Sequence, residues 1–176
     1  SFGNLAYTLY GHAVGLRDLG PTQQPMNAFL TILGIETLPV RMDRHIANAR
    51  IVADYLDGHA AIASVGYAGL PSSPYYDLAR KYMPKGPGSV FTFKLKGGYE
   101  VGRKLVNAVE LFSHLANIGD AKSLILHPAS TTHNQLTKEQ QTAAGAGPDV
   151  IRLSIGLETV EDLIRDLDRA LAIATA

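Results

Sequence analysis

In the stretch from Val90 to Lys96, apolar and polar side chains alternate strictly from Phe91 onward. Phe or Leu fills every second position, and Thr or Lys fills the positions between them. Successive side chains of a strand point to opposite faces, so this period predicts a strand that is buried on one face only. Half-buried strands are typical of antiparallel sheets. The chain is therefore expected to build an antiparallel sheet whose apolar face needs a helical layer.

Further patterns place strands and helices around this one. Three short apolar runs predict strands at 61–67, 123–127 and 150–155, and helical spacing predicts helices at 39–56 and 99–115. Thr159 is expected to cap a last helix, with Asp162 at its third position. Residues 5–35 form a helical lead-in. Because the strands come in pairs between helices, the order predicts an α+β sandwich with helices on one face of a mostly antiparallel, four-stranded sheet.

Composition excludes several classes of function. The chain has 176 residues, close to the prior of about 150 residues per domain, and its 16 Lys and Arg balance 16 Asp and Glu. A neutral chain gives no electrostatic reason to bind nucleic acid or an anionic membrane. Cysteine is absent, and among six scattered histidines only His127 and His133 lie close together, so no metal site is expected. No run reaches the roughly 18 to 20 apolar residues of a membrane span.

Arg152 and two loop segments can each be interpreted either as ordinary structure or as part of a ligand site. Arg152 interrupts the apolar run 150–155 and shares a face with Val150 and Ser154. An arginine there either points to solvent or offers a bidentate fork to a substrate carboxylate. The segments 116–124 and 127–133 are rich in small and hydroxyl residues, which suit either an anion site or ordinary turns.

The chain resembles the C-terminal part of the Cys/Met-metabolism family of pyridoxal-phosphate enzymes, and within it the O-acetylhomoserine sulfhydrylase branch. The Asn-Ile-Gly-Asp form of the loop that starts at Asn117 favours that branch. The resemblance implies the small C-terminal domain of fold type I, in agreement with the order of elements above. The matching strings are Arg17–Gly20, Pro25–Leu30, Gly34–Leu38, Arg41–His45, Asn117–Leu124, His127–His133 and Arg152–Glu158.

The resemblance also implies site residues. In the family the arginine of the Arg-Leu-Ser string binds the substrate α-carboxylate, and that arginine is Arg152 here. Ser123 is expected to contact the same carboxylate region, and Asn117 and Thr132 are further candidates from the same loops.

The chain departs from the family in the cofactor site. None of its seven lysines stands in the family's Schiff-base context, and the phosphate-binding turn and the ring-stacking tyrosine are also missing. No catalytic residue is therefore expected in this chain. Residues 1–35 are interpreted as the end of the large cofactor-binding domain with interdomain helices, and 36–176 as the substrate-carboxylate-binding domain. Pyridoxal 5'-phosphate would be bound by a missing N-terminal part, and the chain alone is expected to be inactive.

The function that the resemblance implies is the replacement of acetate in O-acetylhomoserine by sulfide or a thiol. It further implies a cytoplasmic homotetramer whose N-terminal half would cover apolar residues of the lead-in: Leu5, Leu9, Met26, Phe29 and Leu30. A cystathionine γ-synthase, cystathionine γ-lyase or methionine γ-lyase of the same family is an alternative. A non-catalytic, stand-alone domain is another.

Overall fold

The structure is a computed structural model that describes residues 3–176, and the chain divides into two compact units, Ser1–Pro39 and Val40–Ala176. The described part of the first unit consists of helices joined by turns and by the non-helical segment 19–24. Its longest helix begins at Pro25, whose fixed φ suits the first turn of a helix. The elements of this unit are η1 (Gly3–Leu5), α1 (Ala6–Tyr10), the π-helix η2 (Gly11–Asp18) and α2 (Pro25–Glu36).

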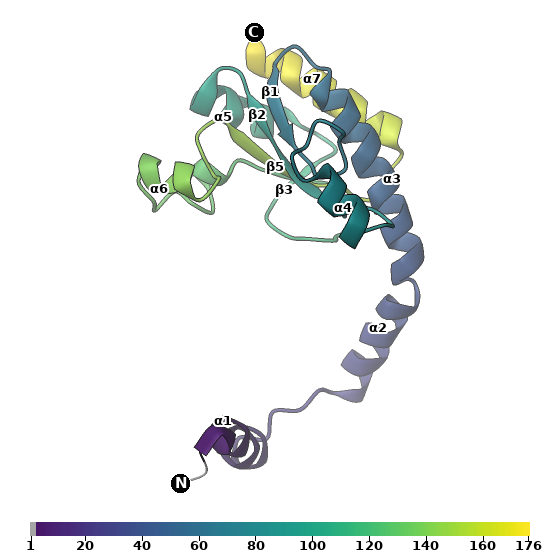
Figure 1. Cartoon of the computed structure of the whole chain (residues 1–176), viewed down its shortest axis with the longest axis vertical. Coiled ribbons are helices and arrows are strands. Elements are labelled where there is room, and N and C mark those ends of the chain that lie inside the picture. The colour runs from purple at the N-terminus through teal and green to yellow at the C-terminus, as the bar shows by residue number, and fades with distance from the viewer. Residues whose placement is uncertain (1–2) are drawn as a thin grey trace. The chain divides into compact units, whose positions relative to one another are not determined.

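The second unit combines helices with one five-stranded sheet (Figure 1). Helix α3 (Leu38–Asp57) leads into it from the end of the first unit. The strands are β1 (Ile62–Gly66), β2 (Val90–Leu95), β3 (Ser113–His114), β4 (Leu124–Leu126) and β5 (Val150–Ser154). The remaining helices are α4 (Tyr76–Tyr82), α5 (Gly98–Ala108), η3 (Pro128–Ser130), α6 (Lys138–Ala143) and α7 (Val160–Thr175).

The sheet is mostly antiparallel, with the strand order β1-β2-β5-β4-β3. Strand β5 is central and pairs antiparallel with β2 and β4, while β3 pairs parallel with β4. The α+β class is confirmed, but the expected number of strands was wrong by one. Ser113 and His114 form the fifth strand, and two residues are too short to produce a periodic pattern.

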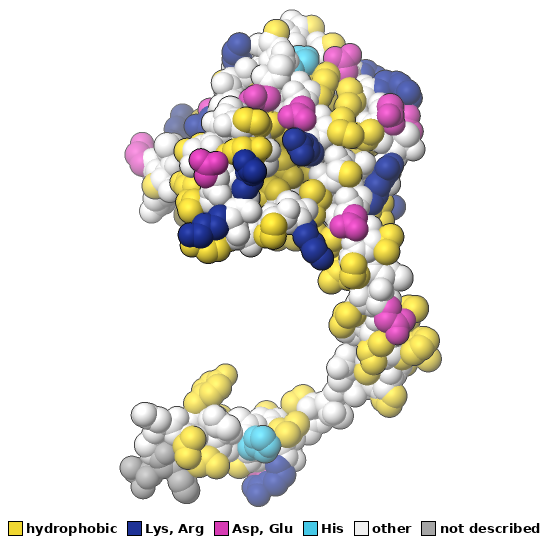
Figure 2. Space-filling model, turned by 45° about the vertical axis from the view of Figure 1, so that its right-hand side comes forward, with side chains coloured by type: hydrophobic (Ala, Val, Ile, Leu, Met, Phe, Trp, Pro, Cys, Tyr) yellow, Lys and Arg dark blue, Asp and Glu magenta, His cyan; other side chains and the backbone are white. Residues whose placement is uncertain are grey.

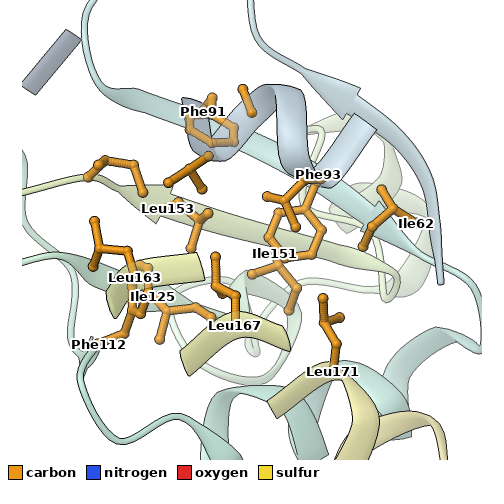
Figure 3. Packing of buried hydrophobic residues seen from close by; sticks show 14 of the residues in the cluster. Ile62, Phe91, Phe93, Phe112, Ile125, Ile151, Leu153, Leu163, Leu167 and Leu171 are labelled. Atoms are coloured by element: carbon orange, nitrogen blue, oxygen red, sulfur yellow. The ribbon is translucent and has the colours of Figure 1, made fainter. Parts of the chain in front are cut away.

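One face of the sheet carries the core. The alternating aromatic residues Phe91 and Phe93 are 3% and 1% exposed, as the period of β2 predicted. Leu163, Leu167 and Leu171 of α7 point toward them and toward the side chains of β5 (Figure 3). Buried residues of α3 and α5 complete the same cluster. Helices α3, α5 and α7 therefore cover one face, and the opposite face of β5 carries Val150, Arg152 and Ser154.

Helix α5 ends earlier than its sequence predicts. The pattern suggested a helix to about residue 115, whereas the helix stops at Ala108. The carboxylate of Asp166 on α7 accepts hydrogen bonds from the backbone N–H groups of Glu110, Leu111 and Phe112 at 2.8–3.2 Å. Those donors are satisfied by a side chain from another element, so the backbone leaves the helix and turns into β3.

The start of α7 also differs from expectation. Thr159 is the N-cap residue, but its side chain accepts no capping hydrogen bond, and its carbonyl instead accepts one from the N–H of Asp162 at 3.0 Å. None of the helices within residues 3–176 combines the length and the apolar character needed to cross a membrane.

Candidate functional site

Arg152 lies in the middle of the central strand, on the face that α3, α5 and α7 leave open. Its backbone is in register with Thr92 on β2 and with Leu126 on β4. The side chain is partly exposed, and its Nη2 donates a hydrogen bond to the carbonyl oxygen of Asn117 at 3.3 Å. Among residues 3–176 no carboxylate forms an ion pair with it. The guanidinium is thus held on one side by a backbone carbonyl and keeps further donors for a ligand.

A shallow hollow lies beside this guanidinium, and with the side chains as they stand it has no room for a water molecule. Ser154, two residues along β5, is 3% exposed, and its Oγ has no hydrogen-bond partner among the described residues. A buried hydroxyl without a partner costs free energy, so such a group in a native fold calls for an explanation. The hollow is lined by Leu115, Ala116, Asn117, Leu124, Leu126, Arg152 and Ser154.

Ser123 is fully buried and is part of a clamp rather than of the wall of the hollow. Its Oγ donates to Glu158 Oε2 at 2.8 Å and accepts from the backbone N–H of Gly156 at 2.8 Å. Its own backbone N–H donates to Glu158 Oε1 at 2.6 Å. The clamp therefore joins the end of the loop before β4 to the segment after β5, two segments that flank the hollow.

Helix α3 holds the other side of the same segment. Asn48 donates from Nδ2 to the carbonyl oxygens of Gly156 and Glu158 at 3.0 and 2.9 Å. Arg44 donates to Glu158 O at 3.1 Å, and His45 Nδ1 lies 2.6 Å from Ile155 O. Gly156 leaves no room for a side chain, because a Cβ there would lie within 2.6 Å of Glu158 Oε2 and of Lys122 C. The strand that carries Arg152 thus has a rigidly held carboxyl end.

The structure does not bring Thr132 to the hollow. Thr132 is exposed, and its Oγ1 lies 2.8 Å from Nδ1 of the adjacent His133. Asn117 lines the hollow, and its side-chain Oδ1 accepts from the N–H of Ile118 at 2.9 Å. Of the four residues expected from the sequence, Arg152 and Asn117 therefore come together, Ser123 lies in the adjacent clamp and Thr132 lies apart. As substrate contacts all four stay predictions.

Ser154 is the residue that sequence reasoning left out. The signal was present, because the alternation of β5 puts Ser154 on the same face as Arg152. The position could not be recognised as a site residue from the sequence, since only the fold shows that its hydroxyl is buried without a partner.

His127 anchors the segment after β4. Its Nδ1 lies 2.9 Å from Ser130 Oγ and its Nε2 lies 3.0 Å from Pro148 O, which fixes the ring between two loops. Burial lowers the pKa of His127 below its usual 6.5, and only the Pro148 carbonyl and Glu100 oppose that shift. Gly102 permits this packing, because a Cβ there would lie 2.9 Å from the imidazole ring.

The seven lysines are all exposed, and none of them lines the hollow beside Arg152. Lys96 Nζ is engaged with Ala60 O at 2.8 Å. A lysine that forms a Schiff base with an aldehyde cofactor needs an enclosed site in which its pKa is lowered. The residues around the hollow beside Arg152 therefore do not fit a covalently bound aldehyde cofactor.

Comparison with known proteins identifies relatives over almost the whole chain. The family described as "Cys/Met metabolism PLP-dependent enzyme" matches residues 6–172. O-acetyl-L-homoserine sulfhydrylase 1 of Thermus thermophilus is 47% identical over 98% of this chain, and L-methionine gamma-lyase of Porphyromonas gingivalis is 45% identical over 90% of it. The chain spans 41% and 40% of those two proteins.

A solved structure has the same fold. It is a putative O-acetylhomoserine (thiol)-lyase from Campylobacter jejuni, which carries a pyridoxyl-lysine phosphate group. It is 43% identical, with a TM-score of 0.85, over 94% of this chain and 39% of its own.

Proposed function

The chain belongs to the Cys/Met-metabolism family of PLP-dependent enzymes, and from that premise we propose that it is the C-terminal, substrate-carboxylate-binding part of an O-acetylhomoserine sulfhydrylase. The reaction breaks the Cγ–O bond of O-acetylhomoserine and forms a Cγ–S bond to sulfide or a thiol, which releases acetate and gives homocysteine or methionine. The names of the sulfhydrylase relatives support this assignment.

The observation that carries the proposal is the pair of unsatisfied groups on β5. Arg152 has a positive charge without an acidic partner, and Ser154 has a buried hydroxyl without an acceptor or donor, both within the described residues. A carboxylate would accept parallel N–H bonds from the guanidinium, and an O–H bond from the serine once the side chains that cover its hydroxyl move aside. The α-carboxylate of an amino-acid substrate is such a group.

Asn117 and Ser123 support the site in different ways. Asn117 holds the guanidinium through its backbone carbonyl at 3.3 Å, and its side-chain amide nitrogen can donate to the same carboxylate. Ser123 has two partners inside the chain, so we infer that it acts on the site through the clamp with Glu158. Thr132 is retained as a candidate from the neighbouring loop.

Pyridoxal 5'-phosphate supplies the electron sink that this family uses. Because the described lysines do not fit that cofactor, we propose that the remainder of a longer protein binds it and supplies the proton-transferring lysine. What this chain contributes is the orientation of the amino acid: fixing the carboxylate removes rotational freedom before the chemical step. In this proposal the whole protein is a cytoplasmic homotetramer.

Methionine γ-lyase activity is the second candidate, because relatives with that name match at 44–45% identity. Assay of the whole protein separates the two activities. The proposed function predicts acetate release from O-acetylhomoserine that depends on sulfide or a thiol, with little thiol release from L-methionine. Thiol release from methionine without reaction of O-acetylhomoserine would replace the first assignment by the second. A whole protein that performs neither reaction would be a cystathionine γ-synthase, a cystathionine γ-lyase or a non-catalytic domain.

A further inference from the structure

A cavity of about 440 Å³ lies in the second unit, on residues that the hollow beside Arg152 does not share. It is formed by α3, by the loop after β1, by α4 and by the turn after α4. Small-molecule sites typically have volumes of about 300–1,000 Å³, so the cavity is large enough for a ligand of metabolite size. Prominent among the residues that line it are Arg50, Tyr67, Tyr76, Arg80, Met83 and Lys85.

The lining is positively charged. Arg50, Arg80 and Lys85 line the cavity, and no Asp or Glu does. None of these three cations belongs to an ion pair with the described residues. Acidic residues do stand on the same helices: Asp54 lies one turn along α3 from Arg50, and Asp77 precedes Arg80 by three residues on α4. The charges of Arg50 and Asp54 both act on the hydroxyl of Tyr67. Because the lining itself holds three cations and no carboxylate, the surface of the cavity has an excess of positive charge.

The floor of the cavity is rigid. Tyr67 is 2% exposed, packs against Phe91 with 5.1 Å between ring centroids, and donates from its hydroxyl to Gly88 O at 3.0 Å. Burial raises the pKa of Tyr67 to about 12, so the hydroxyl stays neutral beside the cations. A Cβ at Gly69 would lie 2.5 Å from the Tyr67 ring.

A second glycine shapes the opposite wall. Gly86 has φ +121°, and a Cβ there would lie 2.5 Å from Cγ2 of Ile46. Only glycine fits both the conformation and the close approach at this turn. On α4 the guanidinium of Arg80 lies 5.8 Å from the centroid of the Tyr76 ring, a cation–π arrangement that orients it.

We propose that this cavity binds a small organic anion that carries a phosphate group. Arginine presents a planar fork of donors that matches phosphate oxygens, and lysine adds a third positive charge. A phosphate monoester has a charge of about −1.5 to −2 at pH 7, which suits several cations better than the single charge of a carboxylate. The apolar lining from Ile46, Met83 and Pro87 gives the organic body of the ligand a contact surface.

The test is titration of the chain with phenyl phosphate and with inorganic phosphate, followed by calorimetry and by amide chemical shifts. We expect saturable 1:1 binding of phenyl phosphate, weaker binding of inorganic phosphate, and shifts at Ala68, Gly69 and Gly86. Arg50→Gln and Arg80→Gln should each weaken binding about tenfold or more, because each removes charge-assisted hydrogen bonds.

Two arginine variants serve as controls. Arg165→Gln removes an exposed arginine of α7 that is paired with Asp162 at 2.8 Å, and it should leave binding unchanged. Arg152→Gln should also leave it unchanged, which separates this cavity from the proposed carboxylate site. Absence of saturable binding, or equal loss in Arg165→Gln, would overturn the proposal. Weaker binding in Arg152→Gln would mean that the anion binds in the hollow beside Arg152. Equal affinities for phenyl phosphate and inorganic phosphate would mean that the cavity recognises the phosphate group alone.

Discussion

Arg152 donates a hydrogen bond to Asn117 O and has no acidic partner among the described residues, so its remaining donors define the first prediction. In the whole protein, Arg152→Lys should lower kcat/KM about 30- to 150-fold, which corresponds to about 2–3 kcal/mol of lost carboxylate binding in the transition state. A lysine ammonium is a point donor and cannot reproduce the fork. Steady-state kinetics measures the loss.

The control for this prediction is Arg103→Lys, a change of an exposed arginine on α5 that pairs with Glu100 at 3.4 Å. That variant should keep wild-type kinetics. A substrate analogue without the α-carboxylate should show a much smaller difference between wild type and Arg152→Lys. Equal losses with and without the carboxylate would exclude Arg152 as its anchor.

His127 gives a pH dependence whose sign follows from its burial. Desolvation lowers the pKa of His127 in the folded state below 6.5, so below that pH the unfolded chain binds more protons. The resulting stability is fully present above pH 6.5 and is lost as the pH falls toward the folded pKa. The free energy of unfolding in urea should therefore decrease between pH 7 and pH 5, and His127→Gln should flatten that decrease. His12→Gln, at an exposed site, should leave the slope as in wild type; an unchanged slope in His127→Gln would contradict the assignment.

At the scale of the elements, two buried serines on the two sides of the site should behave oppositely. Ser123 joins two segments through Glu158 and Gly156, so Ser123→Ala should lower the free energy of unfolding by about 2–4 kcal/mol, because it leaves buried polar groups without partners. Ser154 has no partner among the described residues, so Ser154→Ala removes an unsatisfied buried hydroxyl and should leave the free energy of unfolding unchanged or raise it by about 1–3 kcal/mol.

The two variants should also separate by function. In the whole protein Ser154→Ala should raise KM because one donor to the carboxylate is gone. Urea unfolding and steady-state kinetics on the same pair of variants check both statements. A strongly destabilised Ser154→Ala would mean that its hydroxyl has a partner in the folded chain.

The elements differ in how far the sequence determines them. The alternation of β2 and the apolar stripe of α7 predict both the element and its buried face, because each element packs one continuous side against the core. The end of α5 and the strand β3 were not predictable in this way. Both depend on Asp166, which lies more than fifty residues further along the chain and reaches the backbone of 110–112 only after α7 has docked.

The site shows the same division. Arg152 could be singled out because a charge inside an apolar strand is unusual, and the resemblance to the family added the loop of Asn117. The roles of Ser123 and Ser154 differ because only the hydroxyl of Ser123 has hydrogen-bond partners. Those partners lie in the segment after β5, and α3 fixes the path of this segment through Asn48 and Arg44.

At the scale of the whole molecule, we propose that this chain orients the substrate while the remainder of a longer protein binds the cofactor. Labelling with the cofactor tests this directly. The seven exposed lysines predict that this chain alone forms no specific Schiff base with pyridoxal 5'-phosphate. Incubation with the cofactor, reduction with borohydride and peptide mass mapping should find at most scattered, substoichiometric labelling. One lysine modified stoichiometrically would contradict the prediction. The whole protein, treated identically, is the positive control.

The last prediction is that the chain associates with itself through apolar residues of the first unit. Its helix α2 exposes a series of large apolar side chains, visible in Figure 2. Met26, Phe29, Leu30, Ile32 and Ile35 are between 55% and 63% exposed, and Leu5 and Leu9 of the lead-in are also exposed. These apolar residues lie on all sides of α2, and a helix that is apolar all round is normally buried in a larger structure. Because the chain spans about two fifths of its relatives, the remainder of a longer protein is its proposed cover.

Without that cover the chain should associate with itself. Sedimentation velocity should show a mean sedimentation coefficient that rises with protein concentration, because burying apolar area is favourable by about 25 cal/mol per Å². Phe29→Glu with Ile32→Glu should suppress the rise by placing charges in the surface. Asn107→Glu with Asn134→Glu adds the same two charges at exposed positions of the second unit and should not. If both double variants suppress association equally, net charge rather than the exposed apolar residues of α2 controls association. A monomer at every concentration would mean that the exposed apolar residues of α2 do not drive association. That result would contradict the proposed interface between α2 and the remainder of a longer protein.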